Sequence, residues 1–323
     1  MSEQIADFLA GTPWASAKRE PLAGDASARR YERLYGPGGT AVLMIAPPAD
    51  GTAFDRFVKV ADWLRAAGFS SPMIEAANRA QGLLLLEDFG DGVMADLAQE
   101  SSAAETTLYE AAGEVVAELA RSQPPAWLSH LDAGGLTTQL KLAFDEMPDR
   151  ALGQALWPDA AACARELLDA LPGSGATHIS LRDLHAQNII WLPEREGLKR
   201  VGLLDFQDAV LAPEGYDLAS LIDDPRRAVP LGLRARIIST HAAVMDRPVA
   251  EMRQAVNTLS LVRNMRILGI FRRAARDRAR PAYLDYLPRT AALVAQAADQ
   301  VAPAALRYII NRVLAGYGLA AAA

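Results

Sequence analysis

The pattern of hydrophobic and polar positions in residues 1–90 predicts a small sheet with one helix. Residues 18–48 contain three short strand-like segments, separated by turn-forming residues at Gly24-Asp25 and at 36–39, the sequence Gly-Pro-Gly-Gly. A short helix is expected before them. Further along, the expected elements are a helix over residues 53–67 and strands over residues 71–78 and 82–88.

From Gly92 onward the apolar pattern is mostly helical. The expected helical segments are residues 93–121, 136–147, 159–171, 231–245, 250–279 and 290–315. Two short apolar runs, NIIWL and RVGLLDF, flank the charged segment PEREGLKR and predict a β-hairpin among these helices. The expected fold class is therefore α+β with two lobes: residues 1–90 form a small antiparallel β-sheet lobe, and residues 91–323 form a larger, mostly helical lobe.

Composition narrows the function without defining it. The chain has 323 residues, 51% of them hydrophobic and 22% charged, and a net charge of −6. This charge gives no case for a nucleic-acid partner, because nucleic-acid-binding domains are usually strongly basic. A single cysteine excludes an internal disulfide framework. No apolar run reaches the length of about 18 residues that a membrane helix needs, and acidic residues stand near the N-terminus where a signal peptide would be basic, so a cytoplasmic protein without a membrane partner is expected.

Three polar residues around the predicted hairpin carry the chemistry. Asp183 and Asn188 lie in the polar segment before the first hairpin strand, and Asp205 follows the second strand. Phosphoryl transfer requires a carboxylate that orients the attacking hydroxyl and oxygen ligands that hold Mg²⁺ on the phosphates. We therefore expect Asp183 to be the catalytic base and Asn188 and Asp205 to be the metal ligands. Each fragment by itself is also common in turns, where aspartate caps helices and closes loops.

The motifs LRDLHAQNIIWL (181–192) and LLDFQDAV (203–210) resemble the catalytic motif of the aminoglycoside phosphotransferase and choline kinase-like superfamily. Further segments resemble its N-acetylmuramate/N-acetylglucosamine 1-kinase branch: GDASARRYER (24–33), LMIAPP (43–48), LLLLEDFGD (83–91), DFQDAVLAPEGYDLASLIDD (205–224) and RNMRILGIFRR (263–273). The resemblance implies a protein-kinase-like fold, with a nucleotide-binding lobe and hinge in residues 1–90 and the catalytic loop and substrate site in residues 91–323. It also implies ATP as phosphate donor, Mg²⁺ as cofactor, and phosphorylation of the anomeric hydroxyl of an N-acetylated amino sugar in cell-wall recycling.

The sequence departs from the family at two positions. Leu181 stands where the family usually has a histidine that braces the catalytic loop, and Met44 stands where kinases usually have a lysine on the third strand. A cation should still meet the nucleotide phosphates, and Arg30 on the second strand is the candidate; the alternative is a solvated strand face.

Further candidate residues follow from these motifs. Gly24, Asp25 and Ser27 lie at the first turn, where a loop covering the phosphates is expected, although an ordinary turn would look the same. Mainly on the resemblance, Glu87 and Phe89 are assigned to a hinge that contacts adenine. His185 is expected to contact the reacting groups or to brace the loop.

Residues after Asp205 complete the predicted site. Gln207 and Asp208 are expected to support metal or substrate, or to close the next turn. Asp217, at a predicted helix start, is assigned to holding the catalytic loop. Arg266, Arg273 and Arg280 recur every seven residues and predict one basic stripe on a helix, which either is a solvated face or attracts an anionic substrate.

Two other functions stay open from the sequence. One is a kinase with another acceptor, such as an amino alcohol or an aminoglycoside, because residues 136–150 lack an aromatic-rich stretch that relatives often carry. The basic stripe disfavours polycationic aminoglycosides. The other is a nucleotide-binding scaffold without turnover, which Leu181 and Met44 motivate and the retention of all three site residues disfavours.

Overall fold

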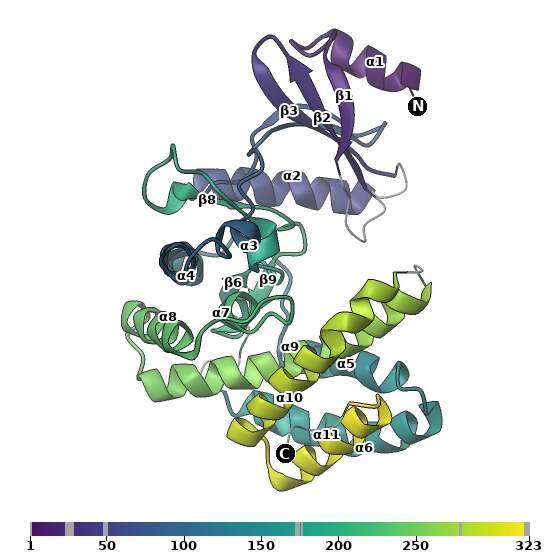
Figure 1. The fold of residues 1–323 in the computed structure, drawn as a ribbon, viewed down its shortest axis with the longest axis vertical. Helices are drawn as coiled ribbons and strands as arrows, with labels where there is room; N and C mark the ends of the chain where they lie inside the picture. Colours follow the sequence, from purple (N-terminus) through teal and green to yellow (C-terminus); the bar gives the residue numbers. More distant parts are fainter. Residues whose placement is uncertain are drawn as a thin grey trace. The chain divides into compact units, whose positions relative to one another are not determined.

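The computed structural model describes residues 2–22, 29–47, 51–171, 175, 177–277 and 280–319. By its internal contacts the chain forms two compact units (Figure 1). Unit 1 comprises Met1–Leu97 and Gln187–Asp208, and unit 2 comprises Ala98–Ala186 and Ala209–Ala323. The nucleotide and substrate roles assigned to residues 1–90 and 91–323 stay predictions.

Unit 1 is built on a five-stranded antiparallel sheet with the strand order β1-β2-β3-β5-β4. The strands are β1 (Lys18–Leu22), β2 (Arg30–Gly36), β3 (Gly39–Ile45), β4 (Ile74–Asn78) and β5 (Leu83–Glu87). The predicted turn at Gly36–Gly39 joins β2 to β3, and Gly39 has a φ of 115°, a conformation that glycine adopts at little cost. All five predicted strands are confirmed, whereas the predicted turn at Gly24-Asp25 lies outside the described residues.

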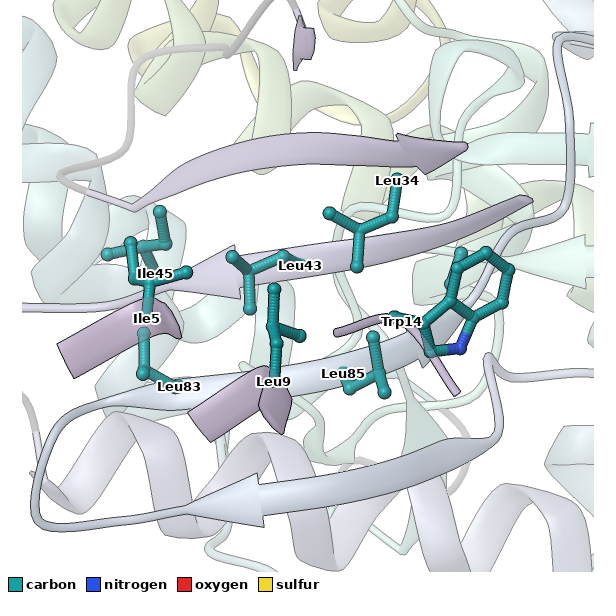
Figure 2. Packing of buried hydrophobic residues seen from close by; sticks show 9 residues of the cluster. Ile5, Leu9, Trp14, Leu34, Leu43, Ile45, Leu83 and Leu85 are labelled. Atoms are coloured by element: carbon teal, nitrogen blue, oxygen red, sulfur yellow. The ribbon is translucent and has the colours of Figure 1, made fainter. Parts of the chain in front are cut away.

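One face of this sheet is covered by the N-terminal segment (Figure 2). Helix α1 (Ser2–Ala10) places Ile5 and Leu9 on the sheet, and Trp14 follows it. The sheet residues of this core cluster are Leu34, Ala41, Leu43, Ile45, Leu83 and Leu85. Because side chains alternate between the faces of a strand, Leu84 and Leu86 point to the opposite face, and they too are buried. The run Leu83–Leu86 is therefore apolar throughout because both faces of β5 are covered.

The remaining elements of unit 1 are α2 (Gly51–Ala66), α3 (Met94–Leu97) and the strands β7 (Ile189–Trp191) and β8 (Val201–Leu203). The predicted hairpin of β7 and β8 is confirmed. It belongs to unit 1 because it bonds to that unit's backbone: the Trp191 amide donates to the Gly92 carbonyl at 2.7 Å, and the Leu203 amide donates to the Ser70 carbonyl at 2.7 Å.

Unit 2 is mostly helical, as predicted. Its helices are α4 (Ser102–Arg121), α5 (Ala133–Asp145), α6 (Arg150–Asp169), α7 (Tyr216–Ile222), α8 (Leu231–Val244), α9 (Val249–Asp277), α10 (Leu287–Val301) and α11 (Ala304–Gly316). A short two-stranded sheet of β6 (His178–Ser180) and β9 (Val210–Ala212), which the sequence did not suggest, completes it. Helix α6 begins well before the predicted 159, and the segment predicted over 290–315 is two helices separated at Pro303.

Helix α9 organises unit 2. It packs against α5, α7, α8 and α10, and most of its length is buried. At Gly269 a Cβ atom would lie 2.6 Å from the Leu142 carbonyl oxygen, so the backbones of α9 and α5 approach one another more closely than any side chain allows. This contact needs glycine, and it fixes the position of α9 against α5.

No helix in the described part of the chain is both long and apolar enough to cross a bilayer.

Candidate active site

The loop that carries Asp183 follows β6 in unit 2 and is held by the buried carboxylate of Asp217. This carboxylate accepts hydrogen bonds from the Ser180 hydroxyl at 2.7 Å, the Leu181 amide at 2.6 Å and the Arg182 amide at 2.9 Å. Burial raises the pKa of Asp217 to about 6, although these three donors favour its ionised form. Asp217 lies in the first turn of α7, yet it bonds to the loop and caps nothing in its own helix.

The same loop contains a strained residue directly before Asp183. Arg182 has a φ of 71°, which a non-glycine residue adopts only at a cost of order 1–3 kcal/mol. The surroundings hold this conformation, since the Ser220 hydroxyl donates to the Arg182 carbonyl at 2.7 Å and Asp217 binds the Arg182 amide. Both peptide groups of Arg182 are thus fixed, and the direction in which the chain presents Asp183 is fixed with them.

Arg263 of α9 contacts Asp183 itself. One guanidinium nitrogen, Nη2, lies 3.9 Å from an Asp183 carboxylate oxygen and 3.3 Å from Asp224, and the Arg263 side chain is 2% exposed. Asp224 also accepts hydrogen bonds from the Arg226 backbone amide and guanidinium, each at 2.9 Å. Burial alone would raise the pKa of Asp224, but the nearby positive charges of Arg226 and Arg263 help to lower it. The buried arginine therefore links Asp183 to a second, ionised carboxylate.

His185 is buried beside this network. Burial lowers its pKa to about 4, against an opposing effect of Asp224, so the imidazole is neutral at neutral pH. A neutral, buried ring suits the bracing role considered for His185 better than a role as a charged acid, and its catalytic assignment stays a prediction.

In unit 1 the β7–β8 hairpin brings Asn188 and Asp205 together. Ile189 pairs with Leu203, and the Leu204 amide donates to the Asn188 carbonyl at 2.9 Å. The Asn188 side-chain amide consequently lies 3.4 Å from an Asp205 carboxylate oxygen, although the two residues are 17 positions apart. Asp205 is exposed and has a φ of 56°. Like Arg182, it is a non-glycine residue with a positive φ in the predicted site.

This pair fits a magnesium ion. Its donors are one carboxylate and one amide. A flip of the Asn188 side-chain amide exchanges its nitrogen and oxygen without changing its shape, so the oxygen can face the metal. Mg²⁺ is typically bound by one or two protein oxygens together with water and substrate phosphates. Among the residues that the structure describes, no group of three or more His, Cys, Asp or Glu side chains gathers to hold a metal.

Gln207 lies next to this pair. Its side-chain amide donates to the other Asp205 oxygen at 2.7 Å, and its backbone carbonyl accepts from the Arg56 side chain at 3.1 Å. Gln207 therefore orients the Asp205 carboxylate, whereas Asp208 is exposed. Arg56 was not among the predicted site residues, because nothing in its helical context marks it.

The residues of the small lobe that were predicted to bind the nucleotide differ in their surroundings. Gly24, Asp25 and Ser27 lie outside the described residues. Arg30 is exposed at the first position of β2, while Arg29 before it is 7% exposed, with its guanidinium carbon 5.9 Å from the centre of the Phe57 ring. Met44 is fully buried in β3, so the position of the usual lysine is part of the core.

The predicted hinge residues have partners within unit 1. The Glu87 carboxylate forms an ion pair with Arg195 and accepts from the Met73 amide at 3.2 Å. The Phe89 ring lies 5.1 Å from the Arg195 guanidinium carbon. Their predicted contact with adenine stays a prediction.

The predicted basic stripe on α9 is wrong. The helix ends at Asp277, so Arg280 lies beyond it. Arg273 and Arg276 instead pair with the buried Glu146. Arg266 remains half-buried on α9. A periodicity of seven in the sequence could not show that Glu146, far away along the chain, forms an ion pair with Arg273.

The comparisons with known proteins agree with this fold. A family model described as the phosphotransferase enzyme family matches residues 18–252. The chain is 34% identical over 328 residues to the N-acetylmuramate/N-acetylglucosamine kinase of Caulobacter vibrioides, covering 88% of each chain. It is 29% identical over 279 residues to the kinase of the same name from Pseudomonas aeruginosa, covering 83% of this chain and 80% of the relative.

A solved structure shares the fold. The choline kinase LicA from Streptococcus pneumoniae superimposes with a TM-score of 0.68 at 13% identity, covering 92% of this chain and 99% of that one. The chain is thus an enzyme that transfers phosphate to a hydroxyl acceptor, with a kinase-like α+β fold. It belongs to the phosphotransferase enzyme family.

Proposed function

We propose that this protein is an ATP-dependent kinase for the anomeric hydroxyl of an N-acetylated amino sugar, N-acetylmuramate or N-acetylglucosamine. The acceptor is supported by the name of the relative that is 34% identical. The chemistry is supported above all by the ion pair of Asp183 with the buried Arg263. An ATP donor is in keeping with the predicted cytoplasmic location and with the word kinase in the names of the relatives.

In this proposal Asp183 orients the sugar hydroxyl and accepts its proton. The oxygen of the hydroxyl then forms a bond to the γ-phosphorus, and the bond from that phosphorus to the leaving oxygen of ADP breaks. Arg263 Nη2 lies 3.9 Å from an Asp183 carboxylate oxygen and would hold the carboxylate in position. Asp217 and Ser220 hold the loop backbone so that the carboxylate keeps its direction.

Asn188 and Asp205 would hold Mg²⁺, with Gln207 fixing the Asp205 carboxylate. When bound, Mg²⁺ neutralises charge on the phosphates of the donor. Arg29 or Arg30 would add a cation on the side of the sheet, in place of the lysine that Met44 replaces.

The experiment that tests the proposal is an assay of ADP release with N-acetylmuramate and with N-acetylglucosamine, followed by identification of the phosphorylated sugar. We expect ADP release and a sugar 1-phosphate with at least one of them. If neither amino sugar is turned over but choline or an aminoglycoside is, the proposed acceptor is wrong and that compound is the acceptor instead.

A scaffold without turnover is the alternative that Leu181 and Met44 suggest. Both side chains are buried, at 2% and 0% exposure. They fill apolar positions, and the loop backbone next to Leu181 is held by Asp217. These departures therefore leave the proposed machinery intact, and the kinase is the better supported function.

A further inference from the structure

Unit 1 contains a pocket of about 350 Å³ that the proposed reaction does not use. Its lining residues are Arg65 at the end of α2, Phe69 and Met73 after that helix, Glu87 at the end of β5, and Arg195 and Lys199 between β7 and β8. Of these, Glu87 alone is among the predicted nucleotide-binding residues. The volume lies at the lower end of the range for small-molecule sites.

The charges in this pocket are unequal. Three cationic side chains line it, against one carboxylate. Arg195 is paired with Glu87, and Arg65 Nη1 also lies 3.9 Å from a Glu87 oxygen, so one negative charge is shared by two arginines. No carboxylate in the described segments lies within ion-pair distance of the exposed Lys199. A concave surface with an excess of positive charge concentrates anions.

Arg195 is already fixed in position before any ligand binds. Its Nη1 donates to the Ser70 hydroxyl at 2.8 Å, Nη2 pairs with Glu87, and the guanidinium carbon lies 5.1 Å from the centre of the Phe89 ring. The side chain remains 30% exposed. A guanidinium held in this way loses little side-chain entropy when it binds an oxyanion.

We propose that this pocket binds a small phosphorylated metabolite of the size of a monosaccharide phosphate. Lys199, Arg65 and the exposed edge of Arg195 would bind the phosphate group. Phe69 and Met73 supply an apolar surface for the organic part of the ligand. Glu87 keeps the two arginines in place, and its negative charge limits the net positive charge of the pocket.

The pocket also has a route to the proposed nucleotide contacts. Arg195 contacts both Glu87 and Phe89, so the negative charge of a phosphate bound beside its guanidinium changes the electrostatic environment of both residues. This part rests on the proposed function. If Glu87 and Phe89 contact the nucleotide, ligand and nucleotide change each other's affinity by the same factor.

Isothermal titration calorimetry of the full chain with glucose 6-phosphate tests the pocket, with inorganic phosphate and glucose as the two partial probes. We expect saturable binding of glucose 6-phosphate, weaker binding of inorganic phosphate, and none of glucose. Lys199→Glu should weaken glucose 6-phosphate binding by about tenfold or more, because it removes a charged hydrogen bond and adds repulsion. Lys59→Glu is the matched control, since Lys59 is an exposed lysine of α2 that does not line the pocket.

Three results would overturn the proposal: no binding of glucose 6-phosphate at millimolar concentration, equal binding by the Lys199→Glu and Lys59→Glu variants, or displacement of glucose 6-phosphate by a non-hydrolysable ATP analogue in simple competition. If Lys199→Glu lowers the melting temperature, Arg65→Gln replaces it, with the same expected loss. The Asp183→Asn variant should bind glucose 6-phosphate as the wild type does. Failure of the pocket is therefore distinct from failure of the kinase, which the ADP assay reports.

Discussion

The Asp183 loop of unit 2 and the Asn188–Asp205 pair of unit 1 are positioned by different means. Buried charged and polar side chains hold the loop: Asp217 binds its backbone, and Arg263 contacts Asp183. The hydrogen bonds of the β7–β8 hairpin hold the pair, and Gln207 donates a hydrogen bond to its exposed carboxylate. The proposed proton acceptor is thus positioned by buried polar and charged groups, whereas the proposed metal ligands are positioned by backbone hydrogen bonds.

Replacing Asp183 tests the first half of this comparison most severely. Asp183→Asn keeps the shape of the side chain but removes the proton acceptor, so kcat should fall by about 10²–10⁴-fold. Nucleotide affinity, measured by calorimetry, should be nearly unchanged. Turnover within a few-fold of the wild type would remove Asp183 from the mechanism.

Arg263→Lys tests whether the buried arginine positions Asp183. Lysine carries the charge on a single ammonium group at the end of a flexible stem and lacks the rigid, planar guanidinium of arginine. We expect kcat to fall by up to about 10²-fold with little change in KM, because a displacement of about 1 Å costs that much. A purely structural role for Arg263 predicts the opposite pattern: a lower melting temperature and an unchanged kcat for the folded fraction.

Gln207→Leu tests the metal half. Loss of the hydrogen bond to Asp205 should raise the Mg²⁺ concentration for half-maximal rate by about 10–100-fold, as for other groups that orient a metal ligand. At saturating Mg²⁺ the rate should largely recover, which no variant of the Asp183 loop should do. Glu194→Gln, an exposed change in the connection between β7 and β8, serves as the control. If the rate of Gln207→Leu depends on the Mg²⁺ concentration as that of the wild type does, Gln207 has no role at the metal site.

The pH dependence of stability tests the buried support of the loop. The folded pKa of Asp217 is raised from 3.8 to about 6, so its contribution is fully present below pH 4 and is lost as the pH rises through 6. Between pH 4 and 7 the free energy of unfolding of the wild type should fall by about 2 kcal/mol relative to Asp217→Asn, which does not titrate there. Denaturant unfolding at several pH values measures this, with the exposed Asp159→Asn as control. Parallel curves for the wild type and Asp217→Asn would contradict the raised pKa.

The sequence predicted the two halves unequally for the same physical reason. The proximity of Asn188 to Asp205 follows from a hairpin, a local element whose strands and turn are visible in the apolar pattern. The contact of Arg263 with Asp183 depends on how α9 packs, which no local pattern contains. No individual role was predicted for Arg263, although it is among the most buried side chains of the described residues.

The role of Asp217 lies between these cases. Its support of the loop was expected from its place in a family motif, together with the helix start, and the helix start alone would have suggested an ordinary cap. The structure instead directs the carboxylate to residues 180–182, far back along the chain. Likewise, the five strands were readable from turns and apolar runs, whereas the β6–β9 pair joins segments of three residues that carry too little pattern to be recognised.

The close approach at Gly269 has a consequence for how this sequence can change. Arg263 lies on the same rigid helix, about 9 Å along its axis from that glycine. An added methyl group at 269 would meet the Leu142 carbonyl at 2.6 Å and force α9 away from α5. A small substitution outside the site would then displace the arginine that touches Asp183, so in evolution or in engineering Gly269 should be as intolerant of change as a residue that contacts the substrate.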